Sequence, residues 1–284
     1  MRITNLHHSG FSVELEQTVL IFDYYQDPAQ VLPAILKKGK QVIYFVSHWH
    51  PDHYSPLILE NAGNPSHYYV IDRQTVERHH LDKKIDASRL LVANEGDRFW
   101  READEAIRLP DIESLAVFGS TDEGVSYLLR AQPDSEKVAD RRTGLIYHAG
   151  DLNDWDWQDD PSPNPAMRMA YREQLFKVKE YLDISIAAER VGGDQPTGDD
   201  LNGFDNLPMI DLAFVPVDQR LGAMAFSGAE ILLEYFIPKL IVPMHLNGGT
   251  DLPNELARRL NKCAGHEQTQ VVQLVESGYV FDTE

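Results

Sequence analysis

A histidine-rich segment directly after a predicted buried strand constrains this chain more than any other feature of its sequence. Residues 41–46 (Gln-Val-Ile-Tyr-Phe-Val) are mostly apolar, β-branched or aromatic, which predicts a strand of the core. Residues 47–53 (Ser-His-Trp-His-Pro-Asp-His) follow without a break. Residues two apart on an extended chain share a face, so we expect His48 and His50 to point the same way and Pro51 to turn the chain after them.

The residue types in this segment predict a metal site. Imidazole and carboxylate are ligands that zinc and its first-row neighbours accept. His48, His50, Asp52 and His53 place four such ligands within six residues. A surface loop that happens to be rich in histidine is the alternative interpretation. It is the weaker interpretation, because four imidazole and carboxylate side chains directly after a core strand are hard to place in an apolar core.

Two later segments end in the same way. Residues 145–149 predict a strand that is followed by Gly150 and Asp151, and residues 240–244 predict a last buried strand that is followed by His245. Gly150 would let the backbone approach a metal closely, whereas a helix N-cap is the alternative role for Asp151. A metal ion that is held by four such ligands, drawn from the three strand ends, can keep an open coordination position for water. A bound metal lowers the pKa of that water from about 15.7 towards 7, which predicts hydrolytic chemistry.

The order and spacing of these three motifs resemble the metallo-β-lactamase superfamily, whose signature is His-x-His-x-Asp-His. The opening residues 3–13 (Ile-Thr-Asn-Leu-His-His-Ser-Gly-Phe-Ser-Val) and residues 18–23 (Thr-Val-Leu-Ile-Phe-Asp) are most similar to its branch of predicted metal-dependent hydrolases related to ascorbate-6-phosphate lactonase. The resemblance implies an α/β fold, a four-layer αββα sandwich, with residues 1–284 forming one domain. His8 is then a candidate for the pocket, and a strand-end residue that the backbone satisfies is an equally good interpretation of it.

The resemblance also implies roles for the site residues. In the family, the acidic residue at the place of Asp151 bridges two metal ions. The second of the two sites would use Asp52, His53 and His245. Asp23 would support the metal-binding loops without touching a metal.

The chain departs from the family at one ligand. The family has a third histidine of the first site between two strands that correspond here to residues 114–118 and 125–129. Residues 119–124 (Gly-Ser-Thr-Asp-Glu-Gly) take this place. Three alternatives remain open: Asp122 supplies an oxygen ligand, the Ser or Thr before it holds a water molecule that completes the shell, or only the second site fills. An oxygen ligand would let the site accept manganese or iron as well as zinc.

Residues 152–208 are predicted to be an insertion near the active site. They contain a helical pattern from residue 166 to 182 and a long polar loop from residue 192 to 200. Trp155 and Trp157 are close in sequence to the acidic ligand. They would form either an apolar wall of the substrate pocket or an anchor for the insertion.

A predicted strand over residues 210–217 leads into Asp218 and Arg220. In the family fold this strand end also faces the site, so Arg220 is a candidate for binding a substrate anion, because guanidinium pairs well with carboxylate or phosphate. A salt bridge with Asp218 is the more common outcome for such a pair. Two other local predictions are a helix over residues 54–62 and a surface position for His67.

Composition limits the partners and the compartment. The formal net charge of −19 disfavours nucleic acid or an anionic membrane as the main partner. A single cysteine, Cys263, excludes an intramolecular disulfide and fits a reducing compartment. Neither a membrane span nor a signal peptide is predicted, so we expect a cytoplasmic protein.

The leading functional hypothesis is a metal-dependent hydrolase. It would hold one or two Zn²⁺ ions, with Mn²⁺ or Fe²⁺ as alternatives, and would cleave a lactone, ester or phosphoester of a small metabolite that could be anionic. The catalytic candidates are Asp52, Asp151 and Arg220. Two other hypotheses are a phosphodiesterase acting on nucleotides and a non-catalytic metal-binding or sensing module with a degenerate first site. Assembly with further copies of the chain is left open.

Overall fold

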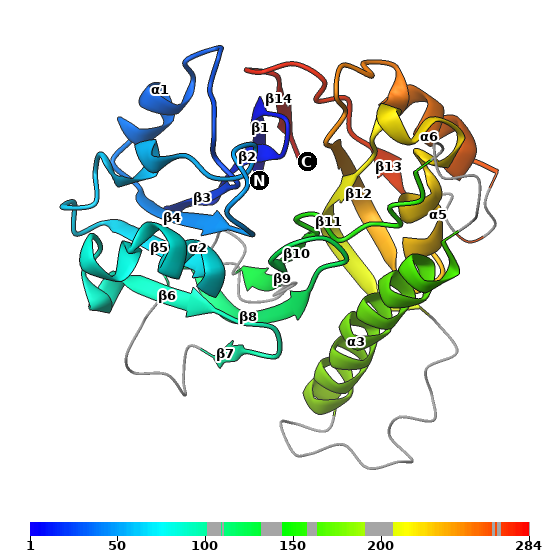
Figure 1. The fold of residues 1–284 in the computed structure, drawn as a ribbon, viewed down its shortest axis with the longest axis horizontal. Helices are drawn as coiled ribbons and strands as arrows, with labels where there is room; N and C mark the ends of the chain where they lie inside the picture. The colour runs from blue at the N-terminus through cyan, green and yellow to red at the C-terminus, as the bar shows by residue number, and fades with distance from the viewer. Residues whose placement is uncertain are drawn as a thin grey trace.

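Two β-sheets stacked face to face form the centre of the protein. The computed structural model describes residues 1–100, 109, 111–131, 144–157, 164–190, 207–262, 265 and 268–283. In these residues each sheet has seven strands, and helices cover the outer face of each sheet (Figure 1). The resulting order of layers is helix, sheet, sheet, helix, as the family resemblance implied.

The first sheet combines an antiparallel and a parallel half. Its strands, in spatial order, are β14 (Val280–Asp282), β1 (Arg2–His7), β2 (Gly10–Glu14), β3 (Thr18–Phe22), β4 (Gln41–Val46), β5 (His67–Asp72) and β6 (Leu90–Ala93). The pairs from β14 to β3 are antiparallel, and those from β3 to β6 are parallel. The strands β3, β4 and β5 are almost wholly buried, which explains their continuous apolar sequences.

The second sheet repeats this design. Its strands, in spatial order, are β13 (Gln270–Val271), β12 (Ile237–Met244), β11 (Met209–Pro216), β10 (Gly144–His148), β9 (Val125–Ala131), β8 (Ile112–Gly119) and β7 (Arg98–Trp100). The pairs from β7 to β10 are antiparallel, and those from β10 to β13 are parallel. Both sheets therefore begin as a meander and continue as parallel strands.

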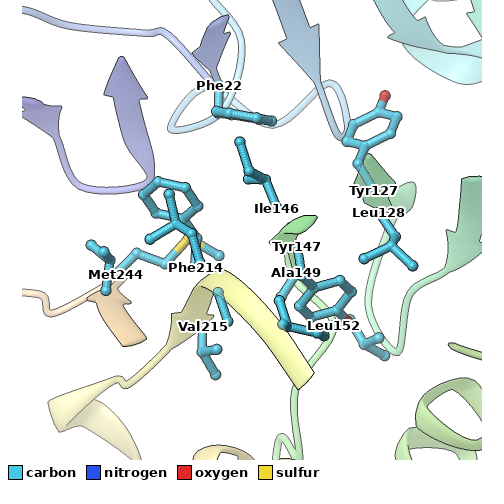
Figure 2. Packing of buried hydrophobic residues seen from close by; sticks show 14 of the residues in the cluster. Phe22, Tyr127, Leu128, Ile146, Tyr147, Ala149, Leu152, Phe214, Val215 and Met244 are labelled. Carbon is cyan, nitrogen blue, oxygen red and sulfur yellow. The ribbon is translucent and has the colours of Figure 1, made fainter. Parts of the chain in front are cut away.

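Alternation along the strands divides the core into two clusters. On β3, Leu20 and Phe22 belong to the cluster between the sheets, whereas Val19 and Ile21 belong to the cluster beneath the helices. Figure 2 shows the inter-sheet packing, in which Phe22 of the first sheet faces Ile146 and Phe214 of the second. The ring centroids of Phe22 and Phe214 lie 5.7 Å apart. These contacts hold the two sheets in a fixed relation, which the site at their edge requires.

Helices cover the two outer faces (Figure 1). The helices α1 (Leu32–Leu36) and α2 (Arg73–His79) lie over the first sheet, and α3 (Pro165–Arg190), α5 (Ser227–Leu232) and α6 (Leu252–Leu260) lie over the second. The long α3 extends the helical pattern predicted for residues 166–182, and it contacts β8 and α5. No helix in the described ranges has both the length and the apolar character of a membrane span.

Two local predictions were wrong. Residues 54–62 form only a short 3-10 turn, η1 (Pro56–Leu59), which begins at Pro56 and is capped by the Ser55 hydroxyl. His67 is buried, not exposed. It is the first residue of β5 and stands on the face that carries Tyr69 and Ile71, so the alternation of the strand turns it under the helical layer.

Candidate metal centre

Three strand ends bring the motif residues together. His48 and His53 follow β4, Asp151 follows β10, and His245 follows β12. The Oδ1 atom of Asp151 lies 3.1 Å from Nε2 of His53 and 3.6 Å from Nε2 of His245, and its Oδ2 atom lies 3.5 Å from Nε2 of His48. Asp151 is therefore the central carboxylate of the cluster, since three imidazoles point at its two oxygen atoms. All four side chains are buried.

Gly150 allows Asp151 to reach this place. Its φ is +54°, and a Cβ atom there would lie 2.7 Å from the carbonyl oxygen of Val125 and 2.8 Å from Cβ of Ser47. Only glycine fits this conformation and this contact. The amide of Gly150 donates a hydrogen bond to Nδ1 of His148, which is wholly buried. The turn after β10 is thus fixed by a residue of the strand itself.

Asp23 supports the motif from behind, as predicted. The carboxylate, at the end of β3, accepts hydrogen bonds from the amide and the hydroxyl of Ser47, both at 2.7 Å, and contacts Nδ1 of His53 at 2.8 Å. Burial alone would lower the pKa of His53, but the carboxylates of Asp151 and Asp23 outweigh it and hold this pKa well above its usual value. His53 is therefore held between two carboxylates, one on each ring nitrogen.

Asp218 supports His245 as Asp23 supports His53, and this role of Asp218 was not predicted from the sequence. Its Oδ2 atom lies 3.1 Å from Nδ1 of His245 and 2.5 Å from the guanidinium of Arg220. Burial opposes ionisation of Asp218, but hydrogen bonds from His245 and Arg220 hold its pKa well below the usual range. The available signal was its position, because Asp218 follows β11 and β11 neighbours β12. The predicted salt bridge between Arg220 and Asp218 is present, at the rim of the site.

The segment that replaces the third histidine forms the hairpin between β8 and β9. Gly124 packs so closely that a Cβ atom there would lie 2.1 Å from the carbonyl oxygen of Ser47. The hydroxyl of Thr121 donates to the carbonyl of Asn153, so it is already engaged. Asp122 is exposed, but a carboxylate oxygen of it lies within 4.8 Å of ligand atoms of both His50 and Asp151. Its pKa is raised by burial and by the charge of Asp151.

His48 and His50, the first two histidines of the motif, also lie close to each other. Nε2 of His48 and Nδ1 of His50 lie 3.1 Å apart. Burial and the neighbouring His53 lower the pKa of His48 to about 3. His48 is therefore neutral over the physiological range, which is the state that a metal ligand needs.

The donor atoms fit a metal ion. Nε2 of His53, Nε2 of His245 and Oδ1 of Asp151 are buried and have no hydrogen-bond partner among the described residues. Buried polar atoms are normally paired, so unpaired ones require an explanation. Two donors at 2.0–2.2 Å from a tetrahedral zinc lie about 3.3–3.6 Å apart, and the separations around Asp151 of 3.1, 3.5 and 3.6 Å are close to this range. Metal ligation by these residues stays a prediction, but their chemistry and spacing suit it.

A cavity of about 340 Å³ opens beside the cluster. The lining residues are His50, Asp52, Thr121, Asp122, Asp151, Trp155, Trp157, Met167, Arg220 and His245. The rings of Trp155 and Trp157 stack at 5.7 Å, and Arg220 lies over the ring of Trp157. The indole of Trp155 also donates to the carbonyl of Asp151 at 2.8 Å. The two tryptophans therefore line the pocket, and Trp155 also anchors the start of the segment after β10.

Comparison with known proteins bears on the fold. No protein-family model and no curated protein matches the sequence. Igni18, a metallo hydrolase from Ignicoccus hospitalis, matches with a TM-score of 0.55 at 16% identity, over 100% of this chain and 99% of its own. The metallo-β-lactamase fold protein YhfI from Bacillus subtilis matches with a TM-score of 0.51 at 11% identity, over 99% of each chain. CmlA, a diiron β-hydroxylase from Streptomyces venezuelae, matches with a TM-score of 0.54 at 11% identity, over 96% of this chain and 53% of its own.

These identities are low, so the matches concern the fold. The strand order of the two facing sheets and the position of the His and Asp cluster at the carboxyl ends of the parallel strands agree with this conclusion. The chain has the metallo-β-lactamase fold.

Proposed function

We propose that this protein is a metal-dependent hydrolase of a small, anionic metabolite with a lactone, ester or phosphoester bond. The observation that carries the proposal is the set of buried, unpaired ligand atoms on His53, His245 and Asp151 beside an open cavity. A structural metal site is closed by four protein ligands, whereas a catalytic one keeps a position for water. The cavity provides room for both the water and a substrate.

The metal ion would supply a water molecule of lowered pKa and would stabilise negative charge on the oxygen atom of the scissile group. Zn²⁺ suits the imidazoles, and an oxygen ligand from Asp122 would also admit Mn²⁺ or Fe²⁺. CmlA, which this chain matches over 53% of its length, is a diiron β-hydroxylase, so iron is among the metals to test. We therefore expect metal identity to depend on whether an oxygen atom of Asp122 takes the place of an imidazole at the first site.

The residues of the cavity suggest a division of roles. Asp52 is partly exposed, and the nearby imidazoles of His245 and His8 hold the pKa of its carboxylate well below the usual range in spite of partial burial. It would orient the attacking water and take its proton. Arg220 would bind an anionic group of the substrate, and Trp157 would provide an apolar wall against the rest of it.

The proposal is tested by metal analysis followed by activity assays. The purified protein should contain Zn²⁺, Mn²⁺ or Fe²⁺, and it should hydrolyse a member of a panel of lactones, esters and phosphomonoesters, assayed beside the phosphodiester bis-p-nitrophenyl phosphate. The His53→Ala and Asp151→Ala variants should lose that activity, because each removes a central donor. His80→Asn is a matched control, since His80 is exposed and asparagine tolerates its φ of +52°.

Two results would point elsewhere. Activity against the phosphodiester alone would favour the nucleotide phosphodiesterase among the alternatives. Metal binding without any hydrolysis, or an activity that neither variant alters, would favour a binding or sensing module. The absence of the family's third histidine from residues 119–124 is the reason to test this second alternative.

A further inference from the structure

We propose that His8, which lies outside the metal motifs, is an additional ligand of the second metal site and makes that site the tighter of the two. This inference rests on the proposed function, since it concerns the same metal centre. His8 occupies the turn between β1 and β2 and is therefore far in sequence from every motif. Its side chain is only 10% exposed.

The ligand atoms of His8, Asp52 and His245 form a compact set. Nε2 of His8 lies 3.4 Å from Oδ2 of Asp52, and Nε2 of His245 lies 3.5 Å from the same oxygen. One ligand atom from each of the three lies within 4.8 Å of the others, and the two imidazole rings are 4.0 Å apart. Separations of 3.4 and 3.5 Å are too long for good hydrogen bonds but match the distance between two donors of one tetrahedral ion.

Each of the two histidines in this set has one ring nitrogen without a hydrogen-bond partner among the described residues. Nε2 of His8 and Nε2 of His245 are buried, and neither has a hydrogen-bond partner in the described part of the chain. Two imidazoles aimed at one carboxylate, with no other partner for their inner nitrogens, leave a space that a cation fills. His7, one residue earlier, differs: it is half-buried, packs beside Tyr25 at 5.5 Å and belongs to no such cluster.

The backbone holds His8 in place at a cost. His8 has a φ of +56° and His245 a φ of +63°, a left-handed region that is strained for a residue with a side chain. The amide of His245 donates to the carbonyl of His8 at 3.4 Å, which ties the two turns together. Such strain is retained where the surrounding structure fixes it, most often at functional sites.

The two sites then differ in their donors. The ligand atoms of His8, Asp52 and His245 form one group, and Oδ1 of Asp151 lies 3.6 Å from Nε2 of His245 and 3.1 Å from Nε2 of His53, which the family resemblance assigns to the same second site. At the first site, His50 and the exposed Asp122 group with Asp151, and Nε2 of His48 lies 3.1 Å from His50 and 3.5 Å from Asp151. The second site is richer in buried imidazole, so the first equivalent of metal should enter it. The imidazole of His8 would thus maintain tight binding of one ion although the first site lacks its third histidine.

The test measures metal affinity and does not depend on activity. Zn²⁺ binding to the metal-free protein is followed by competition with a chromogenic chelator, for the wild type, His8→Gly and the neighbouring control His7→Ala. Glycine removes the imidazole but accepts the positive φ, so the turn is kept. Loss of an outer-shell partner of a metal ligand costs about 10–100-fold in affinity. Loss of a ligand should cost at least as much, so His8→Gly should weaken the first equivalent by at least about 10-fold and His7→Ala should leave it unchanged.

A second measurement covers the case in which His8→Gly does not fold. Crystals of the wild type with one equivalent of Zn²⁺ should give an anomalous peak within bonding distance of Nε2 of His8. A peak bonded to His53 and His245 but not to His8, or a His8→Gly variant with unchanged affinity, would overturn this inference and leave the proposed function intact. A wild type that binds no metal would overturn both.

Discussion

Replacement of Asp23 by asparagine should weaken metal binding although Asp23 touches no metal. Oδ1 of Asp23 accepts the amide of Ser47, and Oδ2 accepts the Ser47 hydroxyl and lies 2.8 Å from Nδ1 of His53. Asparagine has the same shape and tolerates the φ of +41° at this position. It has, however, only one oxygen atom to accept with.

The consequence falls on the tautomer of His53. If the asparagine oxygen keeps the amide of Ser47, its NH₂ group faces Nδ1 of His53, which must then become an acceptor. The ring proton moves to Nε2, the nitrogen that points at Asp151. A protonated Nε2 cannot bind a metal. Loss of such an orienting partner costs about 10–100-fold in metal affinity, which is about 1.4–2.7 kcal/mol.

Competition with a chelator at neutral pH measures this loss directly. The control is Asp211→Asn. Asp211 lies on β11, near the end of this strand that is remote from the site, and its partly buried carboxylate pairs with Lys239 of β12. The Asp211 variant should bind metal as the wild type does. An Asp23→Asn protein that is folded and binds Zn²⁺ with wild-type affinity would refute the reasoning about the tautomer.

Three further predictions concern the turn, a buried carboxyl and the pocket. Gly150→Ala places a Cβ atom 2.7 Å from a carbonyl oxygen at a φ of +54°. The free energy of unfolding, measured in urea, should therefore fall by about 2–4 kcal/mol. A fall of less than about 0.5 kcal/mol would contradict the packing argument. Burial raises the pKa of Asp72 to about 6, above the value near 3.9 of an unfolded chain, so the folded state holds this proton more tightly. Stability should therefore fall as pH rises from about 4 to about 6, by up to about 3 kcal/mol, and this part of the pH profile should be absent in Asp72→Asn, whose amide can still cap α2. Arg220→Gln should raise the KM for an anionic test substrate by about 10-fold or more with less effect on kcat, whereas an equal KM in wild type and variant would exclude Arg220 from binding the anion.

The sequence predicted the strands around the site well, because their signals are local. The apolar runs before His48, Asp151 and His245 are buried on both faces, so they read as continuous hydrophobic segments. Ligand-type residues directly after such strands stand out against this background. The burial of His67 could not be predicted in the same way, since it depends on the helical layer that covers β5.

The sequence also indicated which ligand is missing, but it left the replacement open. Thr121 and Asp122 were both candidates in the hairpin between β8 and β9. Their different surroundings separate them: the carbonyl of Asn153 engages Thr121, whereas Asp122 comes within ligand distance of His50. Asn153 belongs to the segment after β10, so this distinction comes from packing between distant parts of the chain.

The sequence by itself determined which strands end in ligand-type residues, because hydrophobic periodicity and residue type are local signals, and the resemblance of these motifs to the metallo-β-lactamase superfamily then implied the type of fold. Only the tertiary structure decided that Asp218 orients His245 and that His8 lies against Asp52. Those contacts join residues more than 25 positions apart. They depend on how the two sheets stack and on how sharply each turn bends, and neither is fixed until the whole core has packed.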